Sequence, residues 1–110
     1  KITSANLFDI FREAQIIVEA FDCAKEKSMI VNAFCDDIRF SDKYLVCASG
    51  LAGYESSNTI KTIQFTNNVY ICGDFVSSAE NLGVMAPRVW LAAAQQANMV
   101  LRLLLGITTV

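Results

Sequence analysis

The feature that most constrains the fold is a largely apolar segment, residues 16–21, which is followed by Asp22 and then directly by a helix-forming segment. A strand followed in this way by a helix is typical of α/β proteins. In open α/β sheets, ligands bind outside the carboxyl ends of the strands. Asp22 is therefore predicted to place a carboxylate at such an edge, near the positive end of a helix dipole. The alternative interpretation is that Asp22 only caps the helix.

The segments that follow predict a parallel βαβ unit. A helix is expected over residues 24–34, with Met29, Ile30 and Phe34 facing inward. Residues 44–48 form a continuous apolar run without alternation, which is typical of a strand covered on both faces in a parallel sheet. Strand, helix and strand in this order predict an α/β fold of the Rossmann-like type.

Turn and cap residues delimit the other elements. Asn67 and Asn68 tolerate positive φ and separate two alternating segments, which predicts an antiparallel hairpin. Pro87 suits the first turn of a helix, and Gly106 suits its end. We expect a short helix capped by Ser4 or Asn6 and ending near Ala14, hairpin strands at residues 59–65 and 69–72, loops at residues 49–58 and 73–84, and a long helix from Pro87 to Gly106.

The long C-terminal helix is predicted to be buried. Most of its circumference is apolar, so it should be packed on several sides. The apolar run over residues 89–105 is interrupted by polar groups, which a membrane-spanning helix rarely carries in this number. Its polar residues are predicted to fall on one stripe that contains Arg88, Gln95, Asn98 and Arg102.

Length and composition predict a single domain that spans residues 1–110 and that associates with a partner. Apolar residues make up 54% of the chain and charged residues only 18%, so we expect another chain to cover some apolar surface, as in a homodimer or other homo-oligomer. A net charge of -2 without a basic stripe argues against nucleic acid. Because residue 1 is Lys rather than Met, we interpret the chain as a fragment of a longer polypeptide.

The cysteine pattern and the absence of histidine exclude several kinds of chemistry. The four cysteines form no C-x-x-C pair and the chain has no His, so a zinc site is not expected. Without His there can be no Ser–His or Cys–His nucleophile. Reduced thiols fit a cytoplasmic protein, and Cys23, beside Asp22, is interpreted as a buried neutral thiol.

Three ordered blocks of the chain, residues 18–22, 48–54 and 83–106, together resemble the C-terminal half of the ThiF/MoeB/HesA family. This resemblance covers nearly the whole chain. It implies part of a Rossmann-like adenylyltransferase that uses ATP and Mg²⁺ to activate the C-terminal glycine of a ubiquitin-like sulfur-carrier protein. Thiamine biosynthesis is the type of pathway that the closest branch of the family implies.

The resemblance assigns few site residues. It implies that Asp22 is the catalytic carboxylate that holds Mg²⁺ beside the α-phosphate of ATP. Lys27 aligns with a basic residue on the following helix and is a weaker cofactor-binding candidate, since a solvated lysine explains it as well. The phosphate loop of the family is missing from these 110 residues. We therefore expect this fragment alone to be inactive.

The chain also departs from the family pattern in two places. Many members carry two C-x-x-C pairs for zinc, whereas here only Cys72 stands at the corresponding hairpin end. Some members carry a cysteine before the last helix that bonds the carrier, whereas residues 79–82 here read Ala-Glu-Asn-Leu. Neither zinc nor thioester chemistry is therefore expected.

Two other functions stay open. A non-catalytic dimerisation or carrier-docking module would account for the high apolar content. A dinucleotide-binding oxidoreductase shares the strand–helix–strand order, but no G-x-G-x-x-G fingerprint occurs in the chain.

Overall fold

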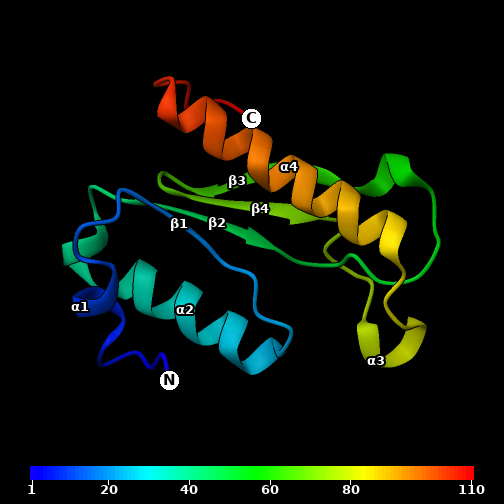
Figure 1. Cartoon of the computed structure of the whole chain (residues 1–110), viewed down its shortest axis with the longest axis horizontal. Helices are drawn as coiled ribbons and strands as arrows, with labels where there is room; N and C mark the ends of the chain where they lie inside the picture. Colours follow the sequence, from blue (N-terminus) through cyan, green and yellow to red (C-terminus); the bar gives the residue numbers. More distant parts are fainter.

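A mixed four-stranded sheet forms the centre of the molecule (Figure 1), and the computed structural model describes residues 1–110. Its strands lie in the order β1-β2-β4-β3. The three strands β1 (Ile16–Val18), β2 (Tyr44–Ala48) and β4 (Val69–Gly73) run parallel. Strand β3 (Lys61–Thr66) pairs antiparallel with β4 at one edge. Because β1, β2 and β4 are parallel, their carboxyl ends all lie on one side of the sheet, which we call its carboxyl edge.

Helices cover the two faces of the sheet. Helix α2 (Ala24–Asp36) lies against one face, and α4 (Ala86–Leu104) crosses the other (Figure 1). The eight-residue core cluster on the α2 side comprises Leu7, Ile17, Ile30, Phe34, Phe40, Leu45, Cys47 and Val69. The cluster on the α4 side comprises Val46, Tyr70, Cys72, Met99 and Leu103. Successive residues of β2 thus enter opposite cores, which explains why this strand shows no polar alternation.

The predicted βαβ unit is confirmed, with one strand shorter than expected. Strand β2 has the predicted bounds, and α2 continues to Asp36. Strand β1 ends at Val18 rather than at residue 21. The backbone N–H of Glu19 still donates to the carbonyl of Val46, 2.9 Å away, but the chain then turns out of the sheet toward α2.

The hairpin is also confirmed as antiparallel. Its second strand, β4, is the one that pairs with β2, a neighbour that the sequence did not predict. Helix α1 (Leu7–Phe11) is shorter than the expected helix up to Ala14, and the predicted loop over residues 73–84 contains a short helix, α3 (Ala79–Leu82). Single 3-10 turns occupy Ile38–Phe40 and Ser57–Thr59.

The prediction that the C-terminal helix is buried on several sides is wrong. Helix α4 has Pro87 in its first turn, as expected, but it packs on the sheet with one face only. Trp90 and Leu104 on its outer side are 70% and 67% exposed, because no other layer covers them. Arg88, the first residue of the predicted polar stripe, is buried.

Candidate functional site

The carboxyl edge of the three parallel strands brings together the polar residues that follow them. Glu19 and Asp22 follow β1, Ser49 follows β2, and Asp74 follows β4. This is the edge at which α/β sheets bind ligands. The sequence interpretation placed Asp22 here, and the β1–α2 connection does lead through this edge.

Asp22 is exposed and its carboxylate makes no hydrogen bond or ion pair. It lies in the turn just before α2, where Cys23 occupies the N-cap position without a side-chain cap. Asp22 therefore does not cap the helix, contrary to the simpler of the two sequence interpretations. An unpaired carboxylate close to a helix N-terminus is available to a cation or to a donor from another molecule.

Glu19 is the residue that sequence reasoning missed. It stands one position beyond β1 and is only 2% exposed. Its Oε1 accepts from the backbone N–H of Phe21, and its Oε2 accepts from the backbone N–H of Ala48 at 3.4 Å. Both oxygens also accept from Lys27 Nζ, at 2.9 and 3.1 Å. The buried charge is thus fully compensated, as a buried carboxylate requires. The sequence signal that could have found Glu19 is a carboxylate placed directly after an apolar strand.

Lys27 lies on α2, and its ammonium group binds protein acceptors. Besides the two Glu19 oxygens, it donates to the carbonyl of Ala48 at 3.2 Å. An ammonium group has three donors, so these contacts use all of them. To bind a phosphate, Lys27 would have to give up one of these bonds. Its role in nucleotide binding stays a prediction.

Gln96 joins this cluster from the other layer. Its side-chain amide, buried on α4, donates to the carbonyl of Glu19 at 3.0 Å and to that of Val46 at 3.4 Å. The end of β1 is therefore bound from α2 through the Glu19 side chain and from α4 through the Glu19 backbone. Such satisfied polar networks hold a segment in one arrangement.

A second buried ion pair lies beyond β4. The Arg88 guanidinium, in the first turn of α4, donates to Asp74. It also donates to the carbonyls of Ala52, Glu55 and Ser56 and to the hydroxyl of Thr59, at 2.9 to 3.1 Å. One side chain thus binds the loops after β2 and β4 to the start of α4. Nothing in the sequence predicts this pairing, because these residues share no local pattern.

Asp74 is held as a carboxylate in this cluster. Burial acts to raise its pKa, but the backbone N–H groups of Ser77 and Val76, with the Arg88 guanidinium, outweigh burial and lower the pKa below its usual value. Its negative charge therefore balances Arg88 in a site where neither side chain is more than 6% exposed.

Two glycines allow the loops to approach each other so closely. At Gly50, with φ +76°, a Cβ atom would lie 2.1 Å from Asp74 Oδ1. At Gly73, with φ +148°, a Cβ atom would lie 1.7 Å from the carbonyl oxygen of Ser49. Both positions therefore require glycine for space and for backbone conformation.

All four cysteines are free: Cys23 and Cys35 are exposed, and Cys47 and Cys72 are buried. The interpretation of Cys23 as a buried thiol is therefore wrong, because it lies in the exposed turn before α2. Burial, with a contribution from the Glu19 carboxylate, raises the pKa of Cys47 to about 12. This thiol is therefore neutral and inert at physiological pH. No three His, Cys, Asp or Glu side chains lie close enough together to hold a metal ion by themselves.

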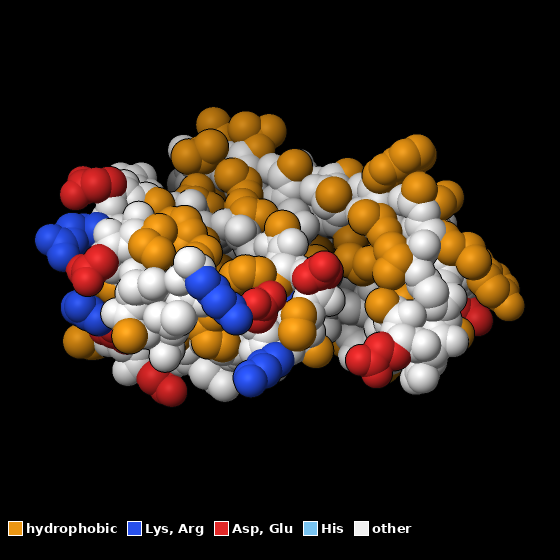
Figure 2. Space-filling model, turned by 60° about the horizontal axis from the view of Figure 1, so that its bottom comes forward, with side chains coloured by type: hydrophobic (Ala, Val, Ile, Leu, Met, Phe, Trp, Pro, Cys, Tyr) orange, Lys and Arg blue, Asp and Glu red, His pale blue; other side chains and the backbone are white.

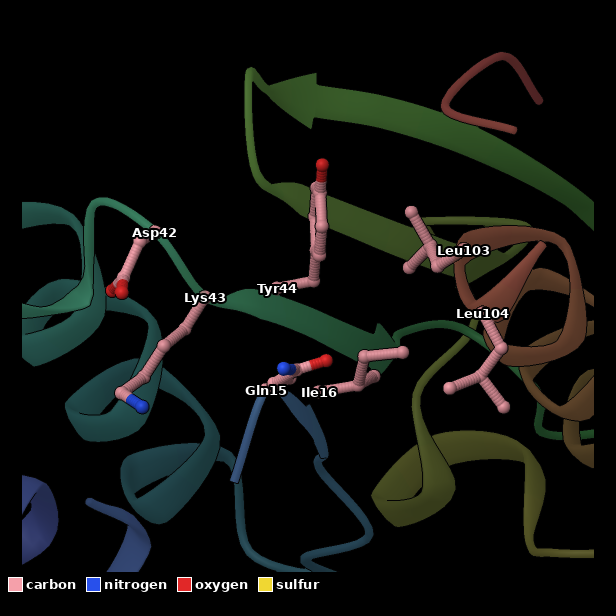
Figure 3. A pocket seen from close by; sticks show the side chains of 7 residues that line it. All are labelled: Gln15, Ile16, Asp42, Lys43, Tyr44, Leu103 and Leu104. Carbon is pink, nitrogen blue, oxygen red and sulfur yellow. The ribbon is translucent and has the colours of Figure 1, made fainter. Parts of the chain in front are cut away.

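An open hollow of about 310 Å³ lies at the opposite edge of the sheet (Figure 3). It begins at Ile16 and Tyr44, the first residues of β1 and β2, and extends to Leu103 and Leu104 of α4. Lys43 runs away from the two leucines, and its ammonium donates to the carbonyls of Arg12 and Ala14, both at 2.7 Å. The lining of the hollow is mixed, because Gln15, Asp42 and Lys43 are polar and the other four residues are apolar or aromatic.

Comparison of the chain with protein-family models, curated proteins and solved structures gave no match. None of its helices combines the length and the apolarity needed to cross a membrane. The candidate site therefore rests on the geometry described above.

Proposed function

We propose that this chain is the C-terminal part of an ATP-dependent adenylyltransferase that activates the terminal glycine of a ubiquitin-like sulfur-carrier protein, in the cytoplasm. The observation that supports the proposal is Asp22, an exposed and unpaired carboxylate at the carboxyl edge of parallel strands in an α/β sheet. The three sequence blocks that resemble the ThiF/MoeB/HesA family supply the type of reaction. The identity of the carrier and its pathway, with thiamine biosynthesis as the first candidate, belong to the same proposal.

The residues at this edge suit a magnesium–nucleotide complex. Mg²⁺ takes one or two protein carboxylates and completes its shell with phosphate oxygens and water. Asp22 has the right chemistry for such a carboxylate, because no group of the chain neutralises it. When bound, the ion would neutralise phosphate charge where two anions must approach each other.

In the proposed reaction, the terminal carboxylate of the carrier bonds to the α-phosphorus of ATP and pyrophosphate leaves. Such a reaction depends mainly on positioning and on charge neutralisation. Asp22 would hold the cation side of the complex. The loop over residues 49–58, fixed by Arg88, would form a wall of the channel for the carrier tail. Lys27 is a weaker candidate for a phosphate contact.

The experiment that tests the proposal uses manganese–ATP as a paramagnetic probe of the ¹⁵N-labelled chain. We expect selective broadening of the backbone amides of residues 19–24 and its loss in Asp22→Asn. Asp42→Asn is the matched control, because Asp42 is an exposed aspartate before β2, at the opposite edge. Broadening near Asp22 that persists in Asp22→Asn would remove this carboxylate from the proposal. In the longer polypeptide, the same substitution should abolish ATP–pyrophosphate exchange.

A second candidate is a non-catalytic module that associates with another copy of itself. Apolar side chains gather at the top of the molecule and at its right-hand end, the end that holds α3 and the start of α4 (Figures 1 and 2). The exposed ones include Tyr54, Val76, Trp90, Leu101, Leu104 and Leu105. Exposed apolar surface of this kind favours self-association.

Sedimentation velocity over a range of concentrations tests this second candidate. A dimer that dissociates in Leu104→Glu but not in Lys25→Glu would support it, since Lys25 is exposed on the opposite layer, on α2. A stable monomer at every concentration would count against it.

A further inference from the structure

We propose that Glu19 is the positioning residue of the candidate site, because its buried carboxylate fixes the turn that carries Asp22. The part of this inference that concerns Asp22 rests on the proposed function. The part that concerns how Glu19 fixes the turn by hydrogen bonds does not depend on the proposed function, and it can be measured without any ligand.

The contacts of Glu19 go beyond what neutralising its charge requires. A buried charge that only needed neutralising could be satisfied by Lys27 alone. Instead, each carboxylate oxygen accepts from the Lys27 ammonium and also from a backbone N–H group. Oε1 accepts from the N–H of Phe21, and Oε2 accepts from the N–H of Ala48. Hydrogen bonds from backbone N–H groups to a carboxylate are among the strong ones. The Glu19 side chain thus links the β1–α2 turn directly to the end of β2.

Asp22 lies between two residues whose backbones are anchored by hydrogen bonds. On one side, the N–H of Phe21 is held by Glu19. On the other side, the carbonyl of Cys23 accepts from the N–H groups of Glu26 and Lys27, both at 3.1 Å, in the first turn of α2. Asp22 itself makes no side-chain contact that could fix it. The direction of its backbone is therefore set by its neighbours, and Glu19 supplies the constraint on the strand side.

Glu19 is itself fixed from both layers of helices. Lys27 holds its carboxylate from α2, and Gln96 holds its carbonyl from α4. A carboxylate at this depth has only one arrangement that satisfies all of its partners. The exposed Asp22 is therefore presented by a rigid support, which is what a binding carboxylate needs in order to meet its ligand at low entropic cost.

Two double variants separate positioning from charge pairing. Both remove the ion pair, but Glu19→Gln/Lys27→Met keeps an oxygen that can accept from the Phe21 N–H, whereas Glu19→Leu/Lys27→Met does not. The measurement is hydrogen exchange of the Phe21 amide in the ligand-free chain. We expect exchange near the wild-type rate in the Gln variant and about tenfold faster in the Leu variant, as loss of one hydrogen bond implies. Equal Phe21 exchange in the two folded double variants would overturn the proposal.

The site itself is read with manganese–ATP on the same proteins. Broadening of the amides of residues 22–24 should be retained in the Gln variant and lost in the Leu variant. If the Phe21 amide exchanges faster but the broadening is unchanged, Glu19 holds the turn without positioning Asp22, and the proposal is overturned. If the wild-type chain shows no broadening near Asp22 and Asp22→Asn leaves ATP–pyrophosphate exchange by the longer polypeptide unchanged, the proposed function fails, while the Phe21 exchange still decides the role of Glu19 in the turn.

A shorter carboxylate covers the case in which the Leu variant does not fold. Glu19→Asp keeps the charge beside Lys27 but is one methylene too short to reach Lys27 and the Phe21 N–H together. We expect the Phe21 amide of this variant to exchange about tenfold faster. Wild-type exchange in Glu19→Asp would show that the carboxylate does not hold the turn.

Discussion

The two buried ion pairs, Glu19–Lys27 and Arg88–Asp74, lie at the same edge of the sheet but differ in their access to water. The Arg88 and Asp74 side chains are 4% and 6% exposed. In the other pair, the Glu19 side chain is only 1% exposed, whereas the Lys27 side chain is 27% exposed. Hydration can therefore replace part of what Lys27 supplies, but water cannot reach the Arg88 pair in the same way.

The pairs differ also in what they connect. Arg88 reaches residues 14 to 36 positions away and binds two loops to a helix. Glu19 holds the turn after β1, with Phe21 two positions and Lys27 eight positions away, and the one distant partner of its side chain is the backbone N–H of Ala48, 29 positions away. The Arg88 pair therefore holds two loops of this edge to a helix, while the Glu19 pair sets the direction of the β1–α2 turn against the end of β2. Three changes can break or sharpen this distinction.

The largest effect is expected for Arg88→Met. This change leaves the Asp74 charge buried without its partner and removes the donor from three loop carbonyls. The free energy of unfolding, measured by urea denaturation, should fall by about 3–5 kcal/mol. Arg102→Met is the control, since Arg102 lies on the same helix but binds only the exposed Thr109, and about 1 kcal/mol or less is expected there. Equal losses in the two variants would contradict the structural role of Arg88.

A smaller loss is expected for Lys27→Met. Glu19 keeps its two backbone donors, and the space near the Lys27 head group is open to water. The free energy of unfolding should fall by about 1–3 kcal/mol in the same urea experiment. Lys25→Met, an exposed lysine on the same helix, should change it by about 0.5 kcal/mol or less. A loss as large as that of Arg88→Met would break the comparison between the two pairs.

The smallest effect concerns pH. The pKa of Asp74 in the folded chain lies below its ordinary value of 3.8, so its ionisation stabilises the fold above that pH. This contribution is lost as the pH falls through the lower, folded pKa. Urea midpoints measured from about pH 5 to about pH 2.5 should therefore fall less steeply in Asp74→Asn than in the wild type. Parallel curves would show that Asp74 is not held as a carboxylate by its donors.

The candidate site could be predicted from the sequence only in part. Asp22 was found because it ends an apolar run before a helix, which is a local pattern. Glu19 stood in the same stretch, but its burial depends on Lys27, Ala48 and Gln96, which meet it only in the folded chain. The exposure of the outer face of α4 was missed because apolarity along a helix does not reveal whether a second layer exists to cover it.

The sequence by itself determined the features that depend on neighbours along the chain. Hydrophobic pattern and backbone preference account for the bounds of β2, the two-asparagine turn of the hairpin and the place of Pro87 in the first turn of α4. Only the tertiary structure decided that β4 lies beside β2, that Arg88 meets Asp74, and that Glu19 meets Lys27. These contacts join residues that lie in different segments of the fold, so no pattern within a single helix or strand relates them. They exist because burial in a common core forces each charge to find a partner.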